Sequence, residues 1–105
     1  MNDQPRQGAP AVPPAASERP QRAASARDEL LADGNMVIYR ADTNQLLTLN
    51  PTAALVWACC DGDHTLPAIV AEVRELFPDA PMVERDVNAI VQDFRTRGML
   101  RPDDE

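Results

Sequence analysis

The chain has 105 residues, which is enough for one domain but not for two. Its net charge of −7 is unevenly spread, because residues 1–27 carry four arginines against two acidic residues, which leaves −9 on residues 28–105. A domain this acidic would repel a phosphate backbone, which argues against nucleic-acid binding. No apolar run approaches the roughly 20 residues that a membrane-spanning helix needs, and the polar N-terminus lacks a signal-peptide core. We therefore expect a cytoplasmic protein with no nucleic-acid and no membrane partner.

Residues 1–27 have the composition of a disordered tail. Val12 is their only β-branched residue, and they contain no aromatic residue. Prolines interrupt the segment at Pro5, Pro10, Pro13, Pro14 and Pro20. Such a segment cannot bury enough apolar surface to offset the entropy lost on ordering. The simplest interpretation is an inert extension, and a docking arm for a partner is the alternative.

Two strands are predicted after this tail. Residues 33–35 (DGN) form a turn signal, and the β-branched and aromatic run 36–39 that follows is typical of a strand. A second turn cluster at residues 42–44 leads into Gln45–Leu49, which we predict to be antiparallel to the first strand because the connection is so short. A further strand is predicted near residues 29–32, ahead of these two.

Three helices are predicted next. The first begins with Asn50 as N-cap and Pro51 at the first helical position, and it ends at the turn 61–63 (DGD). Thr65 caps the second helix, whose apolar residues recur every three or four positions until Pro78 ends it. The third helix spans roughly Met82–Arg97 and stops at Gly98.

Strands followed by helices predict an α+β domain in which a small antiparallel sheet packs against the helices. We assign residues 28–100 to this domain and residues 101–105 to a flexible C-terminal end. A core this small has marginal stability, and a bound partner could add to it.

Residues capable of catalysis are few. His64 is the single histidine, and a histidine in a turn between polar neighbours is usually solvated. The adjacent Cys59 and Cys60 cannot easily bridge each other, and we expect at least one to be buried as a small hydrophobic residue. The sequence has no glycine-rich phosphate loop and no metal-ligand spacing. We therefore predict no catalytic residue, no metal and no cofactor, with a small enzyme using Cys60 or His64 as the alternative.

Two surfaces could bind a partner. The strand Gln45–Leu49 carries neither charge nor proline, so its edge could accept an extended peptide as an added strand. On the third helix, a stripe with spacings of four, three and four residues lies beside the buried face: Asp86, Ile90, Asp93 and Arg97. The candidate peptide-binding residues are therefore Gln45, Leu46, Leu47, Thr48, Leu49, Asp86, Ile90, Asp93 and Arg97. The alternatives are a strand edge covered by the chain itself and an ordinary solvated helix face.

An ordered set of short motifs resembles a known family. The set consists of residues 49–57 (LNPTAALVW), 60–62 (CDG), Thr65, Ile69, 86–87 (DV) and 97–100 (RGML). It resembles protein D of pyrroloquinoline quinone (PQQ) synthesis, the PqqD family, within the wider class of precursor-peptide recognition elements of modified ribosomal peptides. The resemblance covers roughly residues 34–100. One departure is the run 40–44 after Tyr39, where PQQ members tend to have tyrosine, proline and glutamate.

The resemblance implies a winged-helix-like fold of three strands followed by three helices, and no catalysis. It also implies that the leader of a precursor peptide binds as an added strand beside Gln45–Leu49, against the third helix. A radical SAM enzyme or another tailoring enzyme would then receive the peptide, in PQQ biosynthesis or a related pathway. The iron–sulfur cluster and SAM would belong to that partner. We expect a monomer or weak dimer, and the alternative functions are a winged-helix DNA-binding protein and a structural adaptor.

Overall fold

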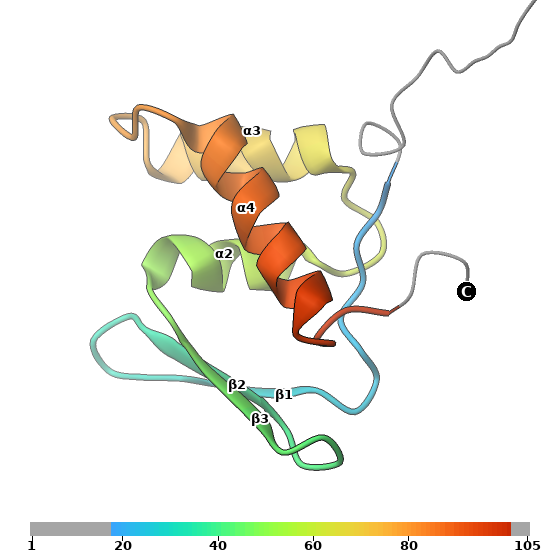
Figure 1. Cartoon of the computed structure of the whole chain (residues 1–105). Helices are drawn as coiled ribbons and strands as arrows, with labels where there is room; N and C mark the ends of the chain where they lie inside the picture. The colour runs from blue at the N-terminus through green and yellow to red at the C-terminus, as the bar shows by residue number, and fades with distance from the viewer. Residues whose placement is uncertain (1–17, 102–105) are drawn as a thin grey trace, which may run out of the picture.

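The computed structural model describes residues 18–101. Strands β1 (Arg27–Leu30), β2 (Met36–Arg40) and β3 (Gln45–Leu49) precede three helices in the chain. The helices are α2 (Pro51–Cys59), α3 (Leu66–Leu76) and α4 (Val83–Thr96). All three helices lie on one side of the sheet, with α2 next to it and α3 farthest away (Figure 1). The predicted α+β architecture is confirmed.

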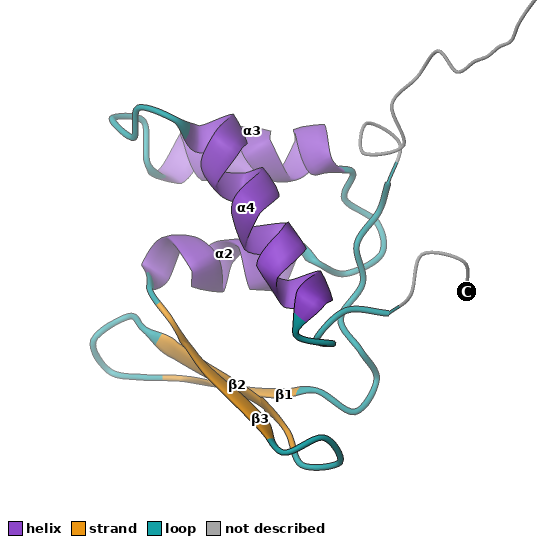
Figure 2. Cartoon of the chain, in the orientation of Figure 1, coloured by secondary structure: helices purple, strands orange, loops and turns teal. Residues whose placement is uncertain are grey.

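The sheet is antiparallel, with β2 in the centre and the order β1-β2-β3. Its first strand begins two residues earlier than predicted, because residues 31–35 are used for the turn into β2 (Figure 2). There the Leu31 N–H donates to Asn35 O at 2.8 Å, and Gly34 adopts a φ of +91° that favours glycine. The shorter turn from β2 to β3 places Asn44 at a φ of 61°.

The predicted helix caps of α2 and α3 are confirmed. The Asn50 side chain accepts a 2.8 Å hydrogen bond from Ala53 N, and Thr65 Oγ1 accepts one of 3.3 Å from Ala68 N. Helix α4 differs, because its N-cap residue Met82 makes no side-chain cap. Each cap satisfies an amide that the first turn would otherwise leave without a partner.

The core lies between the sheet and the helices. Helix α2 is at its centre and is almost wholly apolar, as expected for a helix covered on several sides. Trp57 meets Phe94 of α4 edge to face, with ring centroids 5.3 Å apart. The least exposed side chains are Ile38, Val56, Trp57, Cys60, Ile69, Val73, Val87, Val91, Phe94 and Met99.

Part of the predicted tail is built into the domain. Pro20 is buried, and the backbone around it pairs with two distant segments (Figure 1). On one side Arg22 N donates to Cys60 O at 2.9 Å; on the other, Ala23 N donates to Met99 O at 2.8 Å. We call residues 18–26 the N-terminal strap. The predicted domain start at residue 28 is therefore too late. Residues 18–26 have no apolar pattern from which to predict order, and backbone hydrogen bonds to distant segments hold them in place.

Two predicted terminal segments lie wholly or largely outside the described residues. Of the disordered tail predicted for residues 1–27, residues 1–17 fall there, and of the flexible end predicted for residues 101–105, residues 102–105 do. Arg101 is described, and its N–H donates to Gln21 O of the strap at 2.9 Å.

Candidate functional site

The outer edge of β3 is open within residues 18–101. Strand β3 pairs with β2 on one side, and no described segment pairs with its other side. The described part of the chain therefore does not cover this edge. Over residues 18–101, the alternative that the chain covers its own strand edge is wrong. An open edge presents N–H and C=O groups that can pair with another strand.

The two open edges of the sheet differ in charge. Strand β1 carries Arg27, Asp28 and Glu29 in succession, and charged residues are a common device against strand addition. Strand β3 has the sequence QLLTL and carries no charge. Of the two edges, β3 is the one suited to a guest strand.

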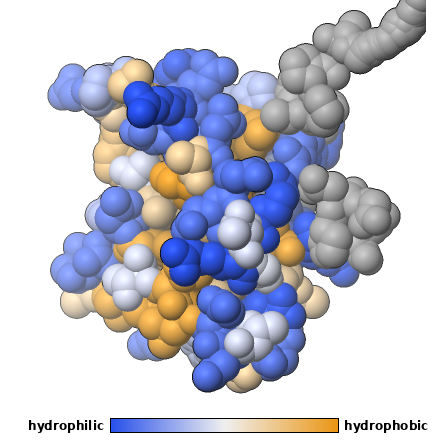
Figure 3. Space-filling model, viewed as in Figure 1, coloured by the Kyte–Doolittle hydropathy of each residue, from blue (hydrophilic) through white to orange (hydrophobic). Residues whose placement is uncertain are grey.

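Side chains along β3 alternate between the two faces of the sheet. Leu47 is half-buried and Leu49 buried, and both face the helices. Leu46 is 66% exposed on the opposite face, where it lies in register with Tyr39 of β2. Figure 3 shows hydrophobic surface around β3 beside hydrophilic side chains of α4.

A groove of about 280 Å³ runs between β3 and α4. Apolar side chains from three elements form most of it, and polar groups stand at its rim. The lining residues are Leu47, Thr48, Leu49, Asn50, Ala53, Ala89, Ile90, Asp93 and Phe94. Such a groove beside an open strand edge can hold an extended segment, with backbone hydrogen bonds at the edge and apolar side chains against the floor.

The structure brings five of the nine predicted site residues into this groove: Leu47, Thr48, Leu49, Ile90 and Asp93. The other four do not line it. Gln45 lies at the far end of β3 opposite Arg40, and Leu46 faces away from the helices. Asp86 is in the first turn of α4, and Arg97 follows its last residue.

Four lining residues were not predicted as site residues. Asn50 was predicted only as a helix cap, and Ala53 and Phe94 are core residues; each of them also reaches the groove. Ala89 lies three residues after Asp86 and four before Asp93, so helical spacing alone could have identified it.

An exposed ion pair occupies part of the helix rim. Arg97 Nε lies 3.0 Å from Asp93 Oδ1, and about half of each side chain is exposed. Pairs of this kind contribute about 0.3–0.5 kcal/mol. The charges of Asp93 and Arg97 offset each other, so Asp86 leaves this side of α4 with net negative charge.

Arg40 holds the sheet at a fixed distance from the end of α4. Its Nη1 donates a 2.6 Å hydrogen bond to Gly98 O, just after the helix, while its Nη2 lies 2.6 Å from Asp42 Oδ2. The same hydrogen-bonded contact lowers the pKa of the Asp42 carboxyl. Gly98 lies just after α4 and Arg40 is the last residue of β2. This bond therefore ties the end of β2 to the C-terminal end of α4.

The residues considered for catalysis are hydrogen-bonded within a turn or buried in the core. Asp61 accepts hydrogen bonds from Asp63 N at 2.9 Å and His64 N at 3.1 Å, and His64 Nδ1 lies 3.0 Å from its Oδ2. Burial raises the pKa of Cys60 to about 12 and also raises that of Cys59. Both thiols are therefore protonated at neutral pH, and a thiol is a far weaker nucleophile than a thiolate.

A metal centre and a membrane span are both absent from residues 18–101. No three histidine, cysteine or acidic side chains of this part of the chain come together as a metal site. None of its helices has both the length and the apolar character required to span a bilayer.

Comparison with known proteins gives consistent matches. Residues 35–100 match the family described as coenzyme PQQ synthesis protein D (PqqD). A relative named PqqA binding protein from Azotobacter vinelandii is 36% identical over 55 residues, which are 52% of this chain and 60% of that protein. The PqqA binding protein of Methylococcus capsulatus is 34% identical over 56 residues, which are 53% of this chain and 59% of that protein. The chain thus spans about 60% of the length of these relatives.

A solved structure shares the fold. The structure described as TbiB1 in complex with the TbiA(beta) leader peptide superposes with a TM-score of 0.67. The match covers 77% of this chain and 94% of that one at 16% sequence identity, so it supports the fold and not a function. Since the family match extends over 66 of the 105 residues, this chain belongs to the PqqD family of coenzyme PQQ synthesis protein D.

Proposed function

We propose that this chain is a non-catalytic peptide carrier. The leader of a ribosomally made precursor peptide adds to the outer edge of β3 as a fourth strand and lies in the groove against α4. The carrier then presents the peptide to a radical SAM enzyme or another modifying enzyme, in PQQ biosynthesis or a related pathway.

One observation supports this function above the others: the uncharged edge of β3 is open over the described residues and borders an apolar groove. The edge can supply backbone hydrogen bonds that do not depend on the guest's sequence, and the groove can select its side chains. Neither feature requires a reactive group in this chain.

The energetics suit reversible binding. Each backbone hydrogen bond contributes about 0.5–1.5 kcal/mol net, and apolar burial adds about 25 cal/mol per Å². Ordering a disordered segment costs about 2–5 kcal/mol or more. We therefore expect micromolar or tighter affinity, near −8 kcal/mol or below.

The groove also specifies what the guest should contain. Because successive side chains of a strand face opposite ways, apolar residues at alternate positions would face Leu47 and Ile90 on the groove side. A basic residue near α4 would meet the carboxylate of Asp93, which lines the groove. The preferred leader is thus extended, alternately apolar and basic at one position.

The comparisons support this assignment by analogy. The relatives carry the name PqqA binding protein, and the solved neighbour was captured with a leader peptide. An enzymatic function would use the two cysteines or His64. The Cys60 thiol is protonated, and the His64 ring contacts the Asp61 carboxylate. The acidic domain gives no support to the winged-helix DNA-binding alternative.

The experiment is a titration of the full chain with the precursor peptide encoded beside its gene, followed by amide chemical shifts and calorimetry. Amides of β3 and of the groove side of α4 should shift. Ala89→Tyr should weaken binding at least roughly tenfold, a loss of about 1.4 kcal/mol, because the ring fills the groove from an exposed helix position. Ala71→Tyr, an equally exposed substitution on α3 outside the groove, is the matched control.

Equal affinity for the Ala89→Tyr and Ala71→Tyr variants would contradict the groove as the binding site. Shifts confined to other surfaces would count against strand addition to β3. Salt-sensitive retention of duplex DNA, with no response to the peptide, would favour the DNA-binding alternative.

A further inference from the structure

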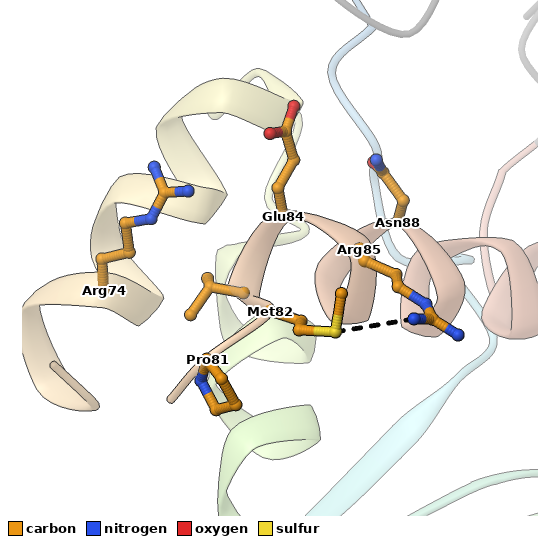
Figure 4. A pocket seen from close by; sticks show the side chains of 7 residues that line it. Arg74, Pro81, Met82, Glu84, Arg85 and Asn88 are labelled. Atoms are coloured by element: carbon orange, nitrogen blue, oxygen red, sulfur yellow. Dashed lines mark hydrogen bonds between the residues drawn. The ribbon is translucent and has the colours of Figure 1, made fainter. Parts of the chain in front are cut away.

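A second concave surface lies on the side of α4 that faces α3. This pocket has a volume of about 590 Å³ and is formed where α3 leads into α4. Figure 4 shows Arg74 extending from α3, Pro81 and Met82 lying just before α4, and Glu84, Arg85 and Asn88 extending from its first turns. The residues that matter are Arg74, Pro81, Met82, Glu84, Arg85 and Asn88.

The pocket and the groove lie mainly on different sides of one helix. On α4, Ile90 and Asp93 face β3, whereas Glu84 and Asn88 face α3. These two pairs lie on either side of the buried stripe that contains Val87. Arg85 of the pocket lies one helical turn before Ala89 of the groove, so the two sites adjoin at that point of α4.

The pocket is locally basic in a chain of net charge −7. Arg74 and Arg85 stand against the single acidic residue Glu84, a local charge of +1. Within residues 18–101 neither guanidinium pairs with a carboxylate, and Arg85 Nη1 contacts Met82 Sδ at 3.5 Å (Figure 4). Two cationic groups from different helices are thus available to an anionic ligand.

The pocket also offers apolar surface. Met82 is 49% exposed, and Pro81 beside it is exposed as well. Methionine adapts its shape to different partners and is frequent on surfaces that bind peptide side chains. A small inorganic anion would use the arginines alone and leave this apolar surface uncovered.

We propose that this pocket docks an acidic segment of a second protein, in which carboxylates alternate with leucine-like side chains. The carboxylates meet the guanidinium groups of Arg74 and Arg85, a pairing that planar guanidinium favours. An apolar side chain of the segment covers Met82. This site goes beyond the proposed carrier function and does not require a guest on β3.

The test uses a short synthetic peptide of glutamate and leucine, titrated into the full chain and followed by amide and arginine side-chain chemical shifts. A peptide with glutamine in place of every glutamate is the first control. Shifts should concentrate at Arg74 and residues 81–88, and they should weaken with added salt because the pairs are near the surface.

Variants then separate this site from non-specific attraction. Arg74→Gln combined with Arg85→Gln should weaken binding roughly two- to fivefold for each arginine. Glu84→Gln should strengthen it, because the substitution removes the one carboxylate in the pocket. Arg27→Gln, an exposed substitution on β1, should leave binding unchanged.

Any of three results would overturn the site: equal shifts with the glutamine peptide, unchanged affinity in the double arginine variant, or no shifts at all. Shifts along β3 instead would place the acidic peptide in the groove and would also overturn it. None of these results bears on binding of the precursor peptide, so the two proposals can fail separately.

Discussion

The indole Nε1 of Trp57 donates a 2.8 Å hydrogen bond to Oδ2 of Asp28. This bond joins the central helix α2 to β1, an edge strand whose side chains are otherwise exposed. Trp57 itself is 1% exposed, so its N–H depends on a protein acceptor. The pair therefore fastens the outer strand of the sheet to the core.

Asp28→Ala should lower the free energy of unfolding by about 1–3 kcal/mol, because the buried indole N–H loses its acceptor. Asp28→Asn should cost less, since its side-chain oxygen can still accept. Urea unfolding followed by tryptophan fluorescence measures both. Glu29→Ala, next to Asp28 and exposed, is the control. Equal losses for Asp28→Ala and Glu29→Ala would show that the bond makes no net contribution to the free energy of unfolding.

Arg22 should be the most sensitive side chain of the N-terminal strap. Its Nη1 donates to Trp57 O and Ala58 O, each at 3.0 Å, near the C-terminus of α2. These bonds satisfy carbonyls at the negative end of the helix dipole. Arg22→Ala should therefore destabilise the domain by about 1–3 kcal/mol, measured as a fall in the urea midpoint.

Arg22→Lys separates geometry from charge. A lysine keeps the positive charge, but its ammonium ends nearer the backbone than Nη1 and lacks the planar guanidinium, so it should recover only part of the loss. Full stability in Arg22→Ala would mean that the strap is held by its backbone bonds alone.

Stability should fall between about pH 4 and pH 2 through Asp61. The N–H of Asp63, followed by the imidazole of His64, lowers the pKa of the Asp61 carboxyl from 3.8 to about 2. A folded-state pKa below the unfolded value gives stabilisation that is complete above the unfolded pKa and is lost as pH falls through the folded one. Asp61→Asn should flatten this part of the profile.

Urea midpoints measured from pH 6 to pH 2 test this expectation. Asp79→Asn, at an exposed turn position between α3 and α4, should keep the slope of the unchanged chain. An identical slope in Asp61→Asn would assign the acid sensitivity to other carboxylates.

The two cysteines should be unreactive in the folded chain. Burial raises the pKa of Cys60 to about 12 and raises that of Cys59, so little thiolate exists at pH 8. Alkylation by iodoacetamide should be slow in the native state and fast in urea. Cys60→Ala and His64→Ala should each retain peptide affinity, whereas loss of binding in a folded variant would give that residue a part in the peptide site.

The sequence determined the local elements correctly where short-range chemistry decides them. Asn50 and Thr65 cap their helices because a side-chain oxygen three residues before an amide satisfies it without any other part of the fold. The apolar stripe of α4 also follows from the sequence, since Val83, Val87 and Val91 recur at the helical period and are buried. Strand β3 and its lack of charge were likewise evident from the residues of that segment alone.

Only the tertiary structure decided the strap and the two surfaces of α4. Residues 18–26 have no apolar periodicity, and their order comes from backbone bonds to segments that approach only after folding, such as Arg22 N to Cys60 O. Likewise, spacing placed Ile90 and Arg97 on one stripe, but the position of β3 brought Ile90 into the groove and left Arg97 outside it. Periodicity fixes which side chains share a face of one element; contacts between distant segments fix what that face meets.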